Sequence, residues 1–170
     1  NVSCPNVVGL TALQDISFLG EIVDKLLELR MYYDTYKPIL LKVSPDLAHQ
    51  QLDEIVDYCL RSGIDGIVAG NTTRSRDGIT SLSKEKIEAI GNGGMSGAPV
   101  HKKNLELVKY VHSRSEGKLP IIGVGGIMSP EQAKAMLDAG ASLVEIYSGF
   151  IFEGPALVKN IIKYLENDAK

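Results

Sequence analysis

The sequence predicts an α/β fold with a parallel sheet and, more specifically, the C-terminal half of a TIM (β/α)8 barrel. Short apolar segments alternate along the chain with longer segments whose apolar residues recur at helical spacing. The short segments are continuously apolar, as in parallel strands covered by helices. Each short segment ends in a polar or glycine-rich turn, and the active sites of β/α barrels are built from such turns.

The first part of the chain is predicted to hold two helices and two strands. Apolar residues from Leu19 to Leu29 fall at helical spacing, and a buried strand follows over Ile39–Val43. Helical spacing returns in "LDEIVDYCLRSG" and ends at Gly63. The second strand is predicted over Gly66–Ala69.

A long polar excursion follows the second strand, from "NTTRSRDGITSLSKEK" to "GNGGMSGAPV", and loops of this length usually bind something. A helix over Leu105–His112 then leads to the third strand, in "LPIIGVGG". The next helix carries its own boundary signals in "SPEQAKAMLDAGA". Ser129 and Gln132 form a capping box, Pro130 suits the first turn, and Gly140 can end the helix.

The chain closes with a fourth strand in "SLVEIYSG" and a helix in "GPALVKNIIKYLEN". The apolar residues predicted to share one face of this helix are Leu157, Val158, Ile161, Ile162 and Leu165. No linker, repeat or low-complexity segment interrupts the alternation. Residues 1–170 are therefore predicted to be a single domain, or part of one.

The composition is that of a soluble globular chain, with 44% hydrophobic residues, 23% charged residues and a net charge of −3. Nucleic-acid binding is not expected, because it favours clustered Lys and Arg. No apolar run approaches the roughly 18 residues of a membrane span. Reduced, intracellular thiols are the simplest interpretation of the two cysteines, so a cytoplasmic location is expected, including the cytoplasmic side of the inner membrane.

The two cysteines cannot form a disulfide framework, and neither belongs to a metal-spaced cluster. Cys59 falls on the apolar face of its helix and is predicted to be plain core. Cys4, in the opening "NVSCPN", has no such stripe around it. His49, His101 and His112 are dispersed, so no metal site is expected.

The unusual residues of the chain follow the ends of the predicted strands. They are Lys42 and Ser44, Asn71 and Thr72, Gly125 and Gly126, and Tyr147 and Ser148. The last two turns match the usual phosphate site of a β/α barrel, where backbone N–H groups receive the anion. "IIGVGGI" lacks the glycine fingerprint of a dinucleotide fold. An ammonium at Lys42 must emerge at the rim or face an anion, because its strand is otherwise apolar.

Six blocks, in this order, resemble dihydroorotate dehydrogenase: "NVSCPN", "LLKVSPD", "AGNTT", "GGMSG", "IIGVGG" and "GASLVEIYSGFIFEGP". The resemblance covers only the C-terminal half of that family's barrel. It implies an FMN-dependent enzyme that oxidises dihydroorotate to orotate in pyrimidine synthesis. "NTTRSR", "GGMSG" and "GASLVEIYSG" resemble the membrane-associated, quinone-linked class.

The resemblance also implies roles for individual residues. Cys4 corresponds to the catalytic base, and a thiol with an ordinary pKa of about 8.5 needs only a modest shift to act near neutrality. Asn1, Asn6, Asn71 and Thr72 match substrate-binding positions, since amides and hydroxyls hold a planar substrate without adding charge. Flavin-binding positions are matched by Asn1, Lys42, Gly70, Ser96, Gly97, Gly125 and Gly126, with Tyr147 and Ser148 near the phosphate. Arg74 and Arg76 are predicted to form a solvated loop face, or to steer an anionic substrate.

Two positions depart from the quinone-linked class. Cys4 stands where that class usually carries Ser, and Val7 replaces a Thr often found nearby. Quinone is still the predicted electron acceptor because the later blocks span more residues; fumarate and NAD are the alternatives. Peripheral membrane association through a segment preceding Asn1 is also expected.

The length of the chain leads to a last set of expectations. A β/α barrel needs about 250 residues and this sequence has 170, so about three strands are expected upstream, with Asn1–Ser3 as the tail of a fifth. The isolated chain is expected to lack flavin and activity, and to self-associate through open edges. Two alternatives stay open: another phosphate-binding barrel, such as a lyase or isomerase, and a non-catalytic fragment.

Overall fold

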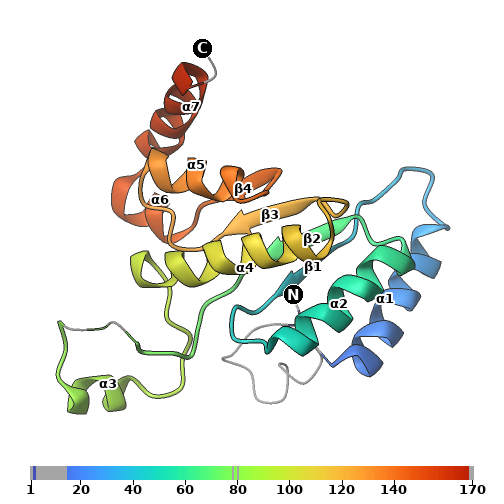
Figure 1. Cartoon of the computed structure of the whole chain (residues 1–170), viewed down its shortest axis with the longest axis horizontal. Helices are drawn as coiled ribbons and strands as arrows, with labels where there is room; N and C mark the ends of the chain where they lie inside the picture. Colours follow the sequence, from blue (N-terminus) through green and yellow to red (C-terminus); the bar gives the residue numbers. More distant parts are fainter. Residues whose placement is uncertain (1, 3–14, 78, 80, 169–170) are drawn as a thin grey trace.

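The computed structural model describes residues 2, 15–77, 79 and 81–168. Its helices and strands alternate along most of the chain (Figure 1). In chain order they are α1 (Ile16–Arg30), β1 (Leu40–Val43), α2 (His49–Ser62), β2 (Gly66–Ala69), α3 (Lys84–Ile90), η2 (Ala98–Val100), α4 (His101–Arg114), β3 (Ile121–Val124), α5 (Pro130–Asp138), β4 (Leu143–Glu145), α6 (Ser148–Glu153) and α7 (Ala156–Asp168).

The four strands form one sheet in the order β1-β2-β3-β4, and all neighbouring pairs are parallel. Strand neighbours in space are therefore strand neighbours in sequence, and the order never reverses. A doubly wound sheet has a reversal at its switch point, whereas a β/α barrel adds its strands in one direction. The predicted α/β fold, corresponding to half of a β/α barrel, is confirmed.

The two faces of the sheet have different surroundings, because successive side chains of a strand point to opposite faces. The face that α2, α4 and α5 cover belongs to the main hydrophobic core and carries Leu41, Ile67 and Ile121 (Figure 1). The register places Lys42, Val68, Ile122 and Leu143 in one row on the other face. Leu143 in that row is 62% exposed. The helices thus bury one face of the sheet and leave the other open at β4.

Two predictions about helix packing have different outcomes. Cys59 is 1% exposed within the core, as predicted, and burial raises the pKa of its thiol to about 12. The apolar stripe of α7 is split, with Leu157 and Ile161 buried. Val158 and Ile162 on the same helix are 41% and 53% exposed. The predicted stripe is therefore only partly core.

Several element boundaries differ from the predictions. Helix α4 begins at His101, four residues before the predicted start, because the 3-10 turn η2 leads directly into it. Strand β4 has only three residues, since the "YSG" turn opens a short helix, α6. The capping of α5 is also shifted. Ser129 accepts from the Gln132 N–H at 3.4 Å, as a cap should, but the Gln132 side chain accepts from the Met128 N–H at 2.7 Å and not from Ser129.

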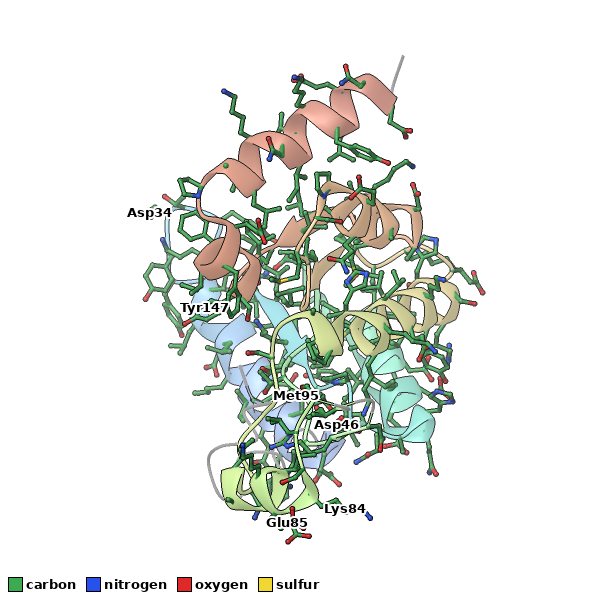
Figure 2. All side chains as sticks on the ribbon, turned by 90° about the vertical axis from the view of Figure 1, so that its left-hand side faces the viewer. Asp34, Asp46, Lys84, Glu85, Met95 and Tyr147 are labelled. Atoms are coloured by element: carbon green, nitrogen blue, oxygen red, sulfur yellow. The ribbon has the colours of Figure 1, made fainter. Side chains whose placement is uncertain are left out.

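Helix α3 lies inside the polar excursion, where no helix was predicted. The Ser83 hydroxyl caps it by accepting from the Lys86 N–H, and Glu85 places a negative charge in its first turn. Lys84 and Glu85 lie at the outer tip of the excursion, away from the sheet (Figures 1 and 2). No residue of α3 is buried, so the apolar pattern that predicts packed helices is missing here.

Two features are absent from the described ranges, a membrane-spanning helix and a metal-binding cluster. No helix in that part of the chain is long and apolar enough to cross a membrane. The same residues contain no group of three or more His, Cys, Asp or Glu placed to hold a metal ion.

Candidate functional site

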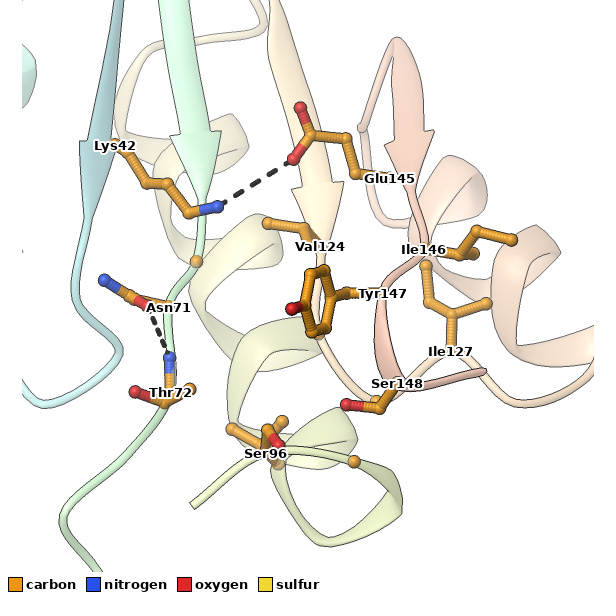
Figure 3. A pocket seen from close by; sticks show the side chains of 15 residues that line it. Lys42, Asn71, Thr72, Ser96, Val124, Ile127, Glu145, Ile146, Tyr147 and Ser148 are labelled. Atoms are coloured by element: carbon orange, nitrogen blue, oxygen red, sulfur yellow. Dashed lines mark hydrogen bonds and ion pairs between the residues drawn. The ribbon is translucent and has the colours of Figure 1, made fainter. Parts of the chain in front are cut away.

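A pocket of about 380 Å³ lies at the carboxyl ends of the strands, where the polar and glycine-rich turns meet (Figure 3). The residues that line it come from all four strand ends and from the segment before α4. They are Lys42, Gly70, Asn71, Thr72, Ser96, Gly97, Val100, Val124, Gly125, Gly126, Ile127, Glu145, Ile146, Tyr147 and Ser148.

Every predicted site residue that lies within the described ranges lines this pocket. These residues are Lys42, Gly70, Asn71, Thr72, Ser96, Gly97, Gly125, Gly126, Tyr147 and Ser148. The remaining three, Asn1, Cys4 and Asn6, lie outside the described residues. The sequence thus located the pocket, while the role of each residue stays a prediction.

Lys42 faces a carboxylate that the sequence analysis missed. The Lys42 Nζ lies 3.9 Å from the Glu145 Oε2, across the two middle strands (Figure 3). The Lys42 side chain is 27% exposed and that of Glu145 49%. Glu145 is the one charged residue in "LVEIY", as Lys42 is in its own strand. A lone charge in each of two apolar strands is a pattern from which the pair could have been predicted. The pair leaves the pocket close to neutral at this point.

The turn after β3 brings the main chain itself to the pocket wall. Gly125 and Gly126 have φ values of +116° and +70°, a region that favours glycine. A Cβ on Gly126 would lie 2.5 Å from the backbone nitrogen of His101, and one on Gly125 would lie 2.0 Å from the Asn104 Nδ2. Both positions therefore require glycine on two independent grounds, conformation and space.

The turn after β2 is held by amide groups. The Asn71 Oδ1 accepts a hydrogen bond from the Thr72 N–H at 2.9 Å (Figure 3). The Asn71 carbonyl accepts from the Nδ2 of Asn104, on α4, at 3.1 Å. Asn104 is fully buried, and no pattern in the sequence marks it, because it precedes the predicted helix start.

The polar excursion is closed at its base by backbone pairing. Thr73 and Met95 exchange two hydrogen bonds, of 3.1 and 2.7 Å. Arg76 donates to the carbonyls of Thr73, Gly91 and Gly93. The predicted solvated role is therefore wrong for Arg76, which ties the two arms of the excursion together, whereas Arg74 is exposed.

Asp46, in the loop after β1, is bonded to two other segments just outside the pocket, the excursion and α4. Its carboxylate accepts from the Thr73 hydroxyl and from the Arg74 N–H at 2.7 Å, and it pairs with Lys103 of α4. Burial opposes ionisation of Asp46, but these hydrogen bonds outweigh it and hold the pKa of the carboxyl below its usual value. Asp46 thus acts as an anionic cross-link between β1, the excursion and α4.

Comparison with known proteins gives a consistent family. The family model described as "Dihydroorotate dehydrogenase" matches residues 1–168. A "Dihydroorotate dehydrogenase (quinone)" of Proteus mirabilis is 42% identical over 169 residues, covering 97% of this chain and 49% of the relative. The protein of that name from Christiangramia forsetii is 44% identical over 161 residues, covering 95% of this chain and 46% of the relative.

Solved structures give the same result for the fold. The crystal structure of the Eimeria tenella DHODH in complex with ferulenol matches with a TM-score of 0.88 at 28% identity. That alignment covers 98% of this chain and 48% of the Eimeria chain. This chain spans about half the length of the curated relatives it matches.

Proposed function

This chain belongs to the dihydroorotate dehydrogenase family, and we propose that it forms the C-terminal portion of an FMN-dependent oxidoreductase that converts dihydroorotate to orotate in pyrimidine synthesis. The observation that carries this proposal is the convergence of all four strand ends on one pocket, with Lys42, Asn71 and the glycine turns in its wall. The complete enzyme then closes the barrel with strands that precede Asn1.

The pocket residues fit a flavin phosphate and ring. Gly97, Gly125 and Gly126 all have positive φ values and offer bare backbone to the pocket, which suits close approach of a phosphate. Tyr147 and Ser148, from the next turn, line the same pocket (Figure 3), and a Cβ on Gly97 would lie 3.9 Å from the Cβ of Ser148. Lys42 supplies an ammonium that can balance negative charge on a reduced ring. When bound, FMN supplies an acceptor for the hydride that leaves dihydroorotate.

Residues of the chain itself bind the substrate and remove its proton. Asn71 and Thr72, with Asn1 and Asn6, bind the carbonyl, amide and carboxylate groups of the substrate. The Cys4 thiolate removes the proton from the carbon beside the carbonyl, as hydride leaves the neighbouring carbon and a C=C bond forms. Quinone serves as the final electron acceptor, a choice supported by the names of the curated relatives. Peripheral contact with a membrane, through a segment preceding Asn1, would bring the enzyme to that acceptor.

The test uses the complete protein and compares two of its thiols, Cys4 and Cys59. Purified protein should show flavin absorbance and form orotate from dihydroorotate, fastest with a short-chain quinone when fumarate and NAD are tried in parallel. Cys4→Ala should retain flavin and lose turnover by at least a hundredfold, because a general base is worth about 10²–10⁴. Cys59→Ala is the matched control, since this thiol is buried in the core and should leave turnover unchanged. Full turnover in Cys4→Ala would remove Cys4 from the mechanism, and colourless wild-type protein would contradict the flavin.

A further inference from the structure

Asn104 is the buried polar side chain that lies closest to both glycine turns of the pocket. Its side chain is 0% exposed, and it lies on α4, behind the pocket wall rather than in it. An ideal Cβ on Gly70 would fall 2.3 Å from its Oδ1, and one on Gly125 would fall 2.0 Å from its Nδ2. The amide is therefore packed between Gly70, the first residue after β2, and Gly125, the first residue after β3.

The two ends of this amide have different hydrogen bonding. The Nδ2 donates to the Asn71 carbonyl at 3.1 Å, whereas the Oδ1 has no hydrogen-bond partner among the described residues. A buried acceptor without a partner costs free energy that an apolar side chain of the same shape would not. Packing alone thus does not account for an amide here, but a donor for the Asn71 carbonyl does.

The first turn of α4 makes a second contact with the same region. A Cβ on Gly126 would meet the His101 backbone nitrogen at 2.5 Å, so the start of α4 lies directly against the turn after β3. One turn later, Asn104 reaches the turn after β2. Helix α4 therefore contacts both turns, and Asn104 donates its hydrogen bond to the turn after β2.

We propose that Asn104 is a positioning residue that sets the Asn71–Thr72 turn at a fixed distance from the Gly125–Gly126 turn. This inference rests on the proposed function, in which the first turn binds the substrate and the second binds the flavin. Asn104 touches neither ligand. It acts through the Asn71 carbonyl, and so determines how substrate and flavin lie relative to each other.

The test replaces Asn104 in the complete protein by Leu, which has a similar shape and no donor. Orotate affinity, titrated through the flavin spectrum, should fall about tenfold, the loss expected for one buried hydrogen bond. FMN occupancy should stay at the wild-type level. Hydrogen exchange should accelerate for the amides of Gly70, Thr72 and Thr73, which the native turn protects through bonds to Val124, Asn71 and Met95.

Val108→Ala is the matched control, because Val108 is fully buried on the same helix and does not line the pocket. It should lower stability without a selective effect on orotate affinity or on exchange in this turn. If Asn104→Leu does not fold, Asn104→Ala gives the same comparison without a branched end between the glycines. Wild-type affinity and exchange in the Asn104 variant, or equal changes in Val108→Ala, would overturn the proposal. If the wild-type protein does not oxidise dihydroorotate, the proposed function fails, and the exchange comparison still decides whether Asn104 holds the turn.

Discussion

The middle of the sheet and its β4 edge differ in how they support the pocket. Strand β2 is buried along its whole length, and the turns after β2 and β3 press against α4 with no room for a Cβ at Gly70, Gly125 or Gly126. Within the described part of the chain, strand β4 pairs only with β3. Leu143 on this strand is 62% exposed, and Tyr147 just after it is 79% exposed. The chain therefore builds one wall of the pocket rigidly and leaves the other wall open.

Two glycines with nearly equal positive φ angles allow this difference to be measured, and here we expect the largest effect. Gly126, in the middle, has φ +70°, and Gly154, after α6, has φ +69°. Alanine is strained at either position because of the positive φ, at a cost of about 1–3 kcal/mol. At Gly126 it also meets the His101 backbone, whereas nothing lies within 4 Å at Gly154.

We expect Gly126→Ala to be less stable than Gly154→Ala by a further 1–3 kcal/mol or so, and to lose its FMN. Urea denaturation and flavin absorbance of the two variants in the complete protein measure both quantities. Equal midpoints with equal flavin content would show that the turn after β3 is not rigid, and the contrast between middle and edge would fail.

The open edge predicts the second effect. Exposed apolar side chains gather on β4, α6, α7 and the turn between β4 and α6, namely Leu143, Tyr147, Ile151, Phe152, Val158 and Ile162. Such a patch beside the outer edge of β4, which has no strand partner among the described residues, favours association. The isolated 170-residue chain should therefore self-associate, bind little FMN and lack dihydroorotate oxidation. Ile151→Glu with Ile162→Glu should shift its sedimentation toward monomer. Leu82→Glu, beside α3 and 40% exposed in the wild type, is the control. A wild-type chain that sediments as a yellow, active monomer would contradict the prediction.

Strand and helix order, the buried Cys59 and most of the pocket wall could be predicted because each depends on local pattern. Continuous apolar runs mark the strands, and the residue after each run must lie at the same edge of a parallel sheet. Asn104 and Arg76 could not be predicted in the same way. Their roles depend on which backbone carbonyls come within reach after folding, and no periodicity in the sequence records that.

Glu145 is an intermediate case. A lone charge in an apolar strand is visible in the sequence, but its partner is set by the register and curvature of the sheet. The register places Lys42 of β1 opposite Val68 of β2, and Glu145 of β4 opposite Val124 of β3. Two strands therefore separate Lys42 from Glu145, and they meet across β2 and β3. The length of β4 was also overestimated, because the "YSG" turn has the composition of a strand end and yet begins α6.

The Lys42–Glu145 pair gives a third prediction, in which two variants should change the flavin reduction potential in opposite directions. Lys42→Met removes the ammonium, so FMN retention and the rate of flavin reduction should fall several-fold in single-turnover measurements. Glu145→Gln removes the carboxylate that lies 3.9 Å away, so Lys42 should act more strongly on the flavin. The flavin reduction potential should then rise in Glu145→Gln and fall in Lys42→Met. A shift of the same sign in both variants, or none in either, would show that Lys42 extends to solvent without serving the flavin.

The smallest expected effect is on stability at low pH, and it depends on Asp46, which links the loop after β1 to the excursion and α4. Hydrogen bonds hold its pKa in the folded protein below the ordinary value of about 3.9. The contribution of Asp46 to folding stability is therefore fully present above the ordinary pKa. This contribution is lost as the pH falls from the ordinary pKa toward the folded pKa, because the unfolded chain takes up the proton first. Asp46→Asn should cost about 1 kcal/mol at pH 7, since the carboxylate is partly exposed. The difference from wild type should shrink in urea denaturation near pH 3. Asp34→Asn, at an exposed loop position, is the control for the removal of an acidic side chain. An equal loss at both pH values would mean that Asp46 contributes through its shape and not through its charge.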